Sequence, residues 1–110
     1  MILLPDDIKR QLMQNNIFRD DDHVPVVKFF LPGTGCTWLI TELEQDGDTL
    51  FGLCDLGMGE PELGYVSLTE LRTVRSRLGL SVERDLHWSG KARLSAYARA
   101  ARASGRIVNV

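Results

Sequence analysis

The feature that most constrains what this chain can fold into is a region of β-forming residues with a hairpin-turn sequence between two of its apolar runs. From Val24 the sequence is rich in Val, Phe, Trp, Ile, Thr and Leu with a period near two, and Asp46-Gly47 separates two apolar runs. An Asp-Gly pair is typical of a two-residue hairpin turn whose central residues have positive φ. Counting outward from this turn predicts the pairs Leu43 with Leu50, Glu42 with Phe51, Ile40 with Leu53, Trp38 with Asp55 and Cys36 with Gly57.

Two further strands flank the predicted hairpin. The first covers about residues 25–31 and ends at the turn sequence Pro32-Gly33-Thr34-Gly35. The second covers about residues 63–66 and follows the turn that ends at Pro61. We therefore predict an antiparallel meander of four strands. Both faces of the hairpin carry apolar side chains, which predicts a sheet covered at least partly on each side.

Helices are predicted before and after this sheet. Pro5 followed by two acids indicates a helix over about residues 5–15, ending at the turn-favouring pair Asn15-Asn16. After the sheet, Ser67 and Glu70 have the spacing of a capping box. Apolar residues then recur at helical spacing and Gly79 supplies a stop, so we predict a helix whose buried face contains Leu71, Val74 and Leu78.

The last 30 residues divide into an extended part and a helical part. Residues 80–88 alternate well enough for a short strand or an extended packing segment with Val82, Leu86 and Trp88 pointing inward. The Ala-rich run from Ser89 to Ala103 predicts a helix that ends at Gly105. Its helical wheel places one group of residues on the buried face: Leu94, Tyr97, Ala98 and Ala101.

These elements fit one α+β domain over residues 1–110, with one or more helices packed on the sheet. A chain of 110 residues, 44% of them hydrophobic, is long enough for one core and has no need of a second domain. The predicted core contains Phe29, Trp38, Ile40, Leu53, Leu71, Val74 and Leu86.

Composition excludes several classes of protein. The apolar runs are far shorter than the roughly 20 residues that cross a bilayer, so we expect no membrane association. The start of the chain lacks the basic leader and apolar centre of a secretion signal, which predicts a cytoplasmic protein. Its two cysteines should then be reduced thiols, and the predicted register keeps Cys36 away from Cys54.

Charge is divided unevenly along the chain. Residues 1–62 hold 4 Lys and Arg against 12 Asp and Glu, and residues 63–110 hold 9 against 3, so a net charge of −2 conceals −8 followed by +6. Fields of this size steer partners rather than determine folds. We therefore expect two oppositely charged surfaces on opposite sides of the domain and a binding role.

The basic surface is predicted on the last helix, which carries no acid from residue 91 onward. Its candidate binding residues are Lys91, Arg93, Arg99, Arg102 and Arg106, of which all but Arg93 lie opposite the buried face if the helix reaches Arg106. Such a surface suits phosphates or an acidic protein. Alternatively, these residues pair internally with the acidic segment Asp20, Asp21 and Asp22. A pI of about 5.6 and the lack of interleaved aromatic residues argue against nucleic acid.

No motif specifies a reaction, and we expect neither a metal nor a cofactor. Gly33-Thr34-Gly35 lacks the Lys and Ser/Thr of a phosphate loop. The two His and two Cys lack the close pairing of a zinc site. The nearest catalytic constellation is Glu83, Asp85 and His87, which alternate and would share one face of an extended segment. The solvent face of an edge strand is the simpler interpretation of these three residues.

Several short segments together resemble a known family. They are Val26-Val-Lys28-Phe-Phe30, Thr37-Trp38 with Thr41-Glu42, Phe51-Gly52-Leu53, Glu62-Leu63-Gly64-Tyr65, Ser67-Leu-Thr-Glu70-Leu71 and Glu83-Arg84-Asp85-Leu86. Over about residues 1–88 the chain resembles the small bacterial family catalogued as domain of unknown function 2958. The resemblance implies a prokaryotic origin and frequent residence on plasmids, phages and integrative elements. It supplies no catalytic residues, and residues 89–110 depart from it as a basic helical extension.

Three functions are consistent with these observations. The leading hypothesis is a non-enzymatic interaction module of a mobile genetic element that binds a protein or a protein–nucleic acid complex through a charged face, with an anti-defence inhibitor as its sharpest form. The second is direct nucleic-acid binding by the basic helix. The third is a hydrolase or nuclease that uses Glu83, Asp85 and His87. The sequence leaves enzyme activity, the partner and the oligomeric state open.

Overall fold

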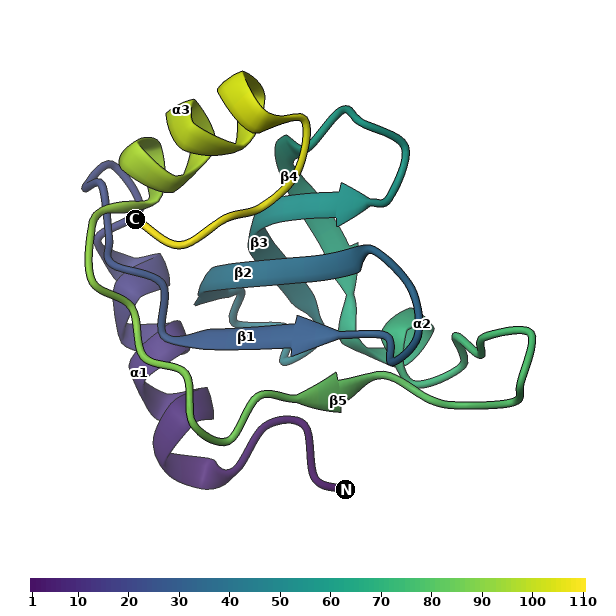
Figure 1. The fold of residues 1–110 in the computed structure, drawn as a ribbon. Coiled ribbons are helices and arrows are strands. Elements are labelled where there is room, and N and C mark those ends of the chain that lie inside the picture. Colours follow the sequence, from purple (N-terminus) through teal and green to yellow (C-terminus); the bar gives the residue numbers. More distant parts are fainter.

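A five-stranded antiparallel sheet with helices on both faces forms the domain, in a computed structural model that describes residues 1–110 (Figure 1). The sheet order is β4-β3-β2-β1-β5, so the four predicted strands follow one another as a meander. In chain order the elements are α1 (Asp6–Ile17), β1 (Val27–Phe30), β2 (Cys36–Leu43), β3 (Thr49–Leu56), β4 (Glu62–Ser67), α2 (Leu68–Leu71), β5 (Glu83–Arg84) and α3 (Leu94–Ser104).

The larger part of the core lies between the sheet and α1. Its centre is formed by side chains that are fully buried, among them Leu12 of α1 and Phe29 of β1. Thirteen buried apolar residues make up this cluster: Leu3, Leu4, Leu12, Val27, Phe29, Leu31, Trp38, Ile40, Leu43, Leu50, Leu68, Leu71 and Val82. The N-terminal segment, α1 and α2 thus cover one face of the sheet.

A smaller cluster holds α3 against the opposite face. Leu39 of β2 and Leu53 of β3 contact the buried side of α3, which consists of Leu94, Tyr97, Ala98 and Ala101. This confirms the predicted buried face of the last helix. The helix is shorter at its start than expected, because it begins at Leu94 rather than near Ser89, and it ends at Gly105 with a φ of 73°.

The central hairpin contains a bulge that the sequence did not indicate. Leu43 pairs with Leu50 and Glu42 with Phe51 as predicted, but Ile40 then pairs with Gly52 because Thr41 is an extra residue. The remaining predicted pairs are therefore wrong by one residue. In the structure Trp38 pairs with Cys54 and Cys36 pairs with Leu56. The turn also differs, since only Gly47 has a positive φ in it.

Helix α1 supports this bulge. The Asn15 side-chain amide donates to the Thr41 carbonyl oxygen at 2.9 Å, and the Asn16 amide donates to the Glu42 carboxylate at 3.2 Å. Both asparagines are buried, and the helix continues past them to Ile17. Our expectation that they end the helix is wrong because their amides satisfy buried polar groups of β2.

The helix after the sheet has the predicted cap but only one turn. The Ser67 hydroxyl accepts from the Glu70 N–H, yet α2 ends at Leu71, and Leu78 is 84% exposed instead of buried. Residues 75–81 form a small projecting turn in which the Ser76 N–H donates to the Leu80 carbonyl oxygen. The β-branched pair Thr73-Val74 and the competing hydroxyl of Ser76 account for this early end.

The extended segment adds the fifth strand. Glu83 and Arg84 pair with Phe30 and Phe29 of β1, at the edge away from β4. Val82 is buried as predicted, whereas Leu86 is 61% exposed and Trp88 is half-buried. The expected core therefore holds except at Leu86 and at the half-buried Val74. None of the helices is of a length and apolarity that would cross a bilayer.

Candidate functional site

Helix α3 presents basic side chains to solvent because its apolar side is used for packing. Arg99 and Arg102 are exposed on the helix, whereas Leu94 and Ala98 are buried. Lys91 lies before the helix and Arg106 follows Gly105, so neither belongs to the helical stripe as predicted. Both are nevertheless exposed. We call Lys91, Arg99, Arg102 and Arg106 the basic face.

None of the four side chains of the basic face forms an ion pair. The structure contains one salt bridge, between Lys28 and Asp85, at 3.9 Å. Of the five predicted binding residues only Arg93 is engaged, since its guanidinium donates to the Asp22 backbone oxygen at 2.8 Å. The alternative of general internal pairing with Asp20, Asp21 and Asp22 is therefore not what the structure shows.

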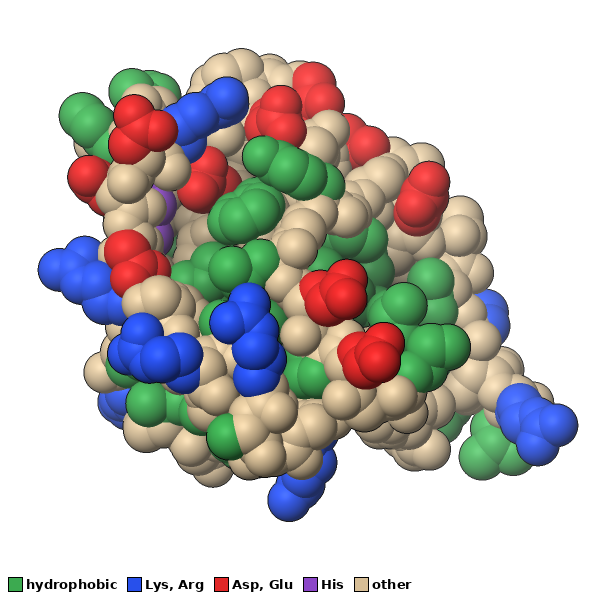
Figure 2. All heavy atoms as spheres, turned by 90° about the horizontal axis from the view of Figure 1, so that it is seen from above, with side chains coloured by type: hydrophobic (Ala, Val, Ile, Leu, Met, Phe, Trp, Pro, Cys, Tyr) green, Lys and Arg blue, Asp and Glu red, His purple; other side chains and the backbone are tan.

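The acidic segment lies beside α3 instead of on the far side of the domain. Asp22 accepts hydrogen bonds from the hydroxyl and the backbone N–H of Ser95, the second residue of the helix. The Ser95 hydroxyl bond, more than the nearby Arg93 and Arg99 charges, holds the pKa of Asp22 below its ordinary value. Figure 2 shows acidic and basic side chains interspersed over the face seen from above α3. Our expectation of oppositely charged surfaces on opposite sides is therefore wrong.

Two carboxylates also border the basic face at the other end of α3. A hollow of about 670 Å³ is lined by Arg102 together with Glu60 and Glu62 from the start of β4 and the turn before it. Neither carboxylate lies within ion-pair distance of Arg102, because Lys28 with Asp85 is the one such pair in the structure. Arg102 therefore faces an open, oppositely charged wall.

An apolar patch adjoins this hollow. Phe51 packs against the α3-side core, and its cross-strand partner Tyr65 lies on the same face, with ring centroids 5.0 Å apart. Leu63 pairs with Leu53 and shares that face. Tyr65 is 67% exposed and Leu63 43%. Cations, carboxylates and exposed apolar side chains thus meet on one side of the sheet.

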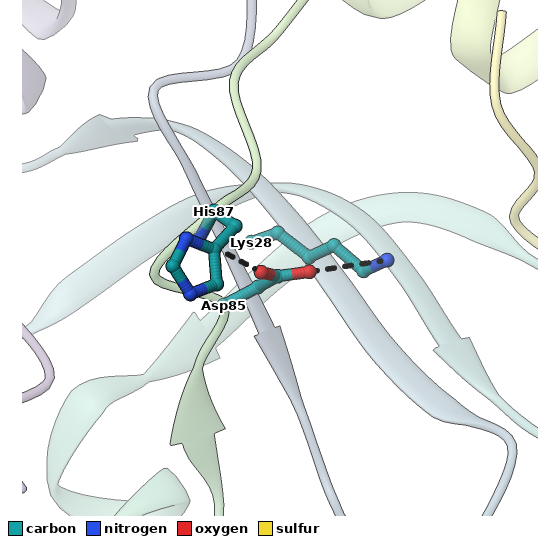
Figure 3. Close-up of polar contacts among 3 residues, drawn as sticks. All are labelled: Lys28, Asp85 and His87. Carbon is teal, nitrogen blue, oxygen red and sulfur yellow. Dashed lines mark hydrogen bonds and ion pairs between the residues drawn. The ribbon is translucent and has the colours of Figure 1, made fainter.

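The three candidate catalytic residues do not form one cluster. Asp85 is bound by the Lys28 ammonium and by the His87 backbone N–H at 3.1 Å, and Figure 3 shows the imidazole on the opposite side of the carboxylate from Lys28. The His87 ring has no hydrogen-bond partner within the protein, so nothing orients it. Glu83 lines a different hollow, of about 420 Å³, beside Arg72 and Arg75.

The remaining groups with possible chemistry are dispersed. No three His, Cys, Asp or Glu side chains gather into an arrangement that could hold a metal ion. Both cysteines are free thiols, and burial raises the pKa of Cys54 to about 11. Asp46 and Asp48 accept bonds from Thr49, Ser67 and Thr69, so these two carboxylates are used to hold turns.

Comparison with known families gives a match over nearly the whole chain. A family model described as "Protein of unknown function (DUF2958)" matches residues 3–108. The chain belongs to this family. The match includes α3, so the basic helix is part of the family's domain, whereas we expected residues 89–110 to depart from it. Comparisons with curated proteins and with solved structures find no match.

Sequence reasoning missed a set of residues that only the fold brings together. Lys28 of β1, Trp88 and Asn109 line one hollow beneath α3 although 81 positions separate the first from the last. No spacing rule links a strand residue to the end of the chain in this way. The one local signal was Trp88, a large aromatic residue beside the basic helix, which we expected to point inward from an extended segment.

Proposed function

We propose that this protein is a non-enzymatic interaction module that binds a macromolecular partner through the surface formed by α3 and the neighbouring part of β4. One observation carries this proposal: Arg99 and Arg102 are exposed on a helix of the domain and form no ion pair within it. Arginine side chains that project from a packed helix are suited to bidentate contacts with carboxylates. Arg is also among the residues that contribute most to protein interfaces.

The chemistry around these arginines favours a protein partner over nucleic acid. A phosphate backbone laid along α3 would meet the carboxylates of Asp22 at one end and of Glu60 and Glu62 at the other. Like charges of this kind repel nucleic acid. A protein surface can match alternating charges and can also cover Tyr65 and Leu63, because apolar contacts form the centre of most protein interfaces.

The proposed setting of this interaction rests on what the family resemblance implies rather than on geometry. The resemblance to a family found on plasmids, phages and integrative elements supports a role for a mobile genetic element in a prokaryotic cytoplasm. An inhibitor of a host defence complex is the sharpest form of this proposal. A small domain with a preformed charged surface is suited to occupying a site on a larger assembly.

Affinity capture from a bacterial lysate tests the proposal. The tagged protein is compared with an Arg99→Ala/Arg102→Ala variant and with a Lys9→Ala/Arg10→Ala control, which removes two exposed charges from α1. We expect a discrete protein whose recovery falls at least about tenfold with the α3 variant, on the order of an interface arginine pair, and is unchanged in the control. Recovery should also decline with salt.

Three outcomes would contradict the proposal. The first is equal capture by the Arg99→Ala/Arg102→Ala variant and by the Lys9→Ala/Arg10→Ala control, because the partner would then use another surface. The second is nuclease-sensitive capture, which would favour direct nucleic-acid binding by the basic face. The third is turnover of nucleic-acid or ester substrates by the purified protein that Glu83→Gln abolishes, which would establish the hydrolase alternative.

A further inference from the structure

A hollow beneath α3 has the composition of a ligand site. It has a volume of about 300 Å³ and lies between β1, β2, the helix and the C-terminal segment. Its apolar lining includes Leu39 and the tilted ring pair Trp88 and Tyr97, whose centroids are 6.0 Å apart. The complete lining consists of Lys28, Leu39, Trp88, Tyr97, Arg106, Ile107, Val108 and Asn109.

The Lys28, Arg106 and Asn109 side chains of this hollow form no hydrogen bond within the protein. Arg106 forms no ion pair, and the Lys28 ammonium reaches only Asp85, at 3.9 Å. The hydroxyl of Tyr97, in contrast, is occupied, because it accepts the Lys91 backbone N–H at 3.0 Å. Two cations and the Asn109 amide therefore line an aromatic-walled space with hydrogen-bond donors that the protein itself leaves unused.

Two carboxylates that contact residues of this lining, Asp85 and Asp55, are already engaged. Asp85 accepts the His87 backbone N–H in addition to its contact with Lys28. Buried Asp55 holds the C-terminal segment in place, since one of its oxygens accepts the Ile107 N–H at 3.0 Å and the other accepts the Gly57 N–H at 2.8 Å. A negative group from outside would thus meet the Arg106 guanidinium, which has no ion-pair partner, and would compete only with Asp85 for the Lys28 ammonium.

A second hollow extends the first. It has a volume of about 250 Å³, shares Trp88, Tyr97 and Asn109 with its neighbour, and adds Lys91 and His87. Trp88 therefore borders both spaces. The joined region carries the basic side chains Lys28, Lys91 and Arg106 beside the rings of Trp88 and Tyr97, and an apolar wall with a few charged groups suits a planar anion.

We propose that this hollow binds a small aromatic anion, with its carboxylate or phosphate held by Lys28 and Arg106 and its ring against Trp88. The proposal goes beyond the interaction surface, because it depends on Lys28 and Arg106 and not on Arg99 or Arg102. Charge-assisted bonds to two cations supply the affinity, and the aromatic wall selects for a planar body.

Two-dimensional NMR of the intact protein tests this site with defined probes. Phenyl phosphate and benzoate supply the two anionic head groups, benzyl alcohol is the neutral match, and inorganic phosphate lacks the ring. We expect phenyl phosphate or benzoate to give saturable shifts at the Trp88 indole N–H and the Asn109 amide. The indole of Trp38, buried in the other core cluster, should stay unchanged. Benzyl alcohol should give no such shifts, and inorganic phosphate should bind more weakly.

Substitutions separate this site from general surface charge. Lys28→Met and Arg106→Gln should each weaken binding of the aromatic anion on the order of tenfold, the loss expected for one charge-assisted hydrogen bond. Arg102→Gln makes the same charge change outside the hollow and should leave the affinity unchanged. Because Arg106 is exposed, its variant tests the site even if Lys28→Met perturbs β1.

Several results would overturn the proposal. They are the absence of localised saturable shifts with both aromatic anions, equal shifts with benzyl alcohol, and unchanged affinity in both Lys28→Met and Arg106→Gln. None of these results bears on partner capture through Arg99 and Arg102, so failure of the ligand site and failure of the proposed function are distinguishable. Benzoate and phenyl phosphate affinities then decide between a carboxylate and a phosphate ligand.

Discussion

The carboxylate of Asp22 caps α3 from outside the helix by accepting the Ser95 backbone N–H at 3.1 Å and the Ser95 hydroxyl. This contact joins the acidic connection after α1 to the start of the basic helix. Asp22 is one of the acids of the first half of the chain, and here it stabilises the fold. An acceptor at a helix N-terminus satisfies an otherwise free N–H. The Arg99 and Arg102 side chains, later in the helix, stay exposed and free of ion pairs.

Removing this cap should destabilise the domain. Asp22→Ala is expected to lower the free energy of unfolding by about 1 kcal/mol, the usual cost of losing a side-chain cap. Asp21→Ala, at an exposed neighbouring position without a hydrogen bond to α3, is the control and should have little effect. Urea denaturation at neutral pH measures both changes. Equal stability of the Asp22 variant and the wild type would contradict the capping role.

The same contact predicts a pH dependence. Hydrogen bonding to Ser95 lowers the pKa of Asp22 in the folded state below the ordinary value of 3.8. A lowered pKa stabilises the fold at pH values above 3.8, and that contribution is lost as the pH falls through the folded-state pKa. The stability difference between wild type and Asp22→Ala should thus be constant from pH 7 to about 5 and shrink below about 4. A constant difference down to about pH 2 would contradict this account.

The bond between Asn15 and the Thr41 carbonyl should be a main support of the β2 bulge. Asn15→Leu leaves this carbonyl without its side-chain donor, and we expect a loss of about 2 kcal/mol in the free energy of unfolding, as for other buried polar groups left unpaired. Gln14→Ala changes an exposed position of the same helix and serves as the control. A loss no larger than that of Gln14→Ala, measured by urea denaturation, would show that the bond is dispensable.

Gly52 should tolerate no side chain at the bulge. A Cβ at Gly52 would lie 1.9 Å from the Leu39 carbonyl oxygen, whereas a Cβ at Gly64 of β4 would have no atom within 4 Å. Gly52→Ala is therefore expected to cost about 3 kcal/mol by overpacking, and Gly64→Ala to be neutral or slightly stabilising. Thermal unfolding of the two variants is a matched comparison. Similar midpoints would mean that the backbones do not approach as closely as described.

Burial should protect Cys54 from thiol reagents. Because its pKa is raised to about 11, few Cys54 side chains are thiolates at pH 8, and thiolates are the reactive form. Iodoacetamide at pH 8 should leave Cys54 unmodified in the folded protein and modify it readily in urea, as followed by peptide mass spectrometry. Comparable rates in the two states would contradict its burial.

The order of the central strands and the pairs next to the hairpin turn could be predicted from the sequence because they follow from local patterns. Asp46-Gly47 placed the hairpin, and the first two pairs, Leu43 with Leu50 and Glu42 with Phe51, are confirmed. The bulge at Thr41 could not be predicted, since the contact that supports it is a long-range bond from Asn15. One inserted residue then moves every later pair.

The helices show the same division between local and tertiary causes. The helical spacing of Leu94, Tyr97, Ala98 and Ala101 was sufficient to predict the buried face of α3. The capping box at Ser67 correctly marked the start of α2 but carried no information on its length, which hydrogen bonds around Ser76 limit. The strand β5 is two residues long and was recognisable only as an extended segment.

The candidate site was predicted in its residues but not in its surroundings. Charge counting identified Arg99 and Arg102, and their exposure without ion pairs agrees with a binding role. The prediction that the acidic side chains lie on the opposite side of the domain from α3 was wrong, because a charge count along the chain does not say which segments meet in the fold. Asp22, Glu60 and Glu62 lie around α3 only because of the fold.

Photo-crosslinking in bacterial cells tests the central claim, that a protein partner covers α3, most directly. A photoreactive residue is placed at Ala103, an exposed position between Arg102 and the end of the helix, and in a separate control variant at Gln14 on the exposed side of α1. We predict a discrete adduct with another protein from position 103, absent from position 14 and lost with Arg99→Ala/Arg102→Ala. Adducts from position 14 alone, or an adduct from position 103 that survives the double substitution, would contradict the account.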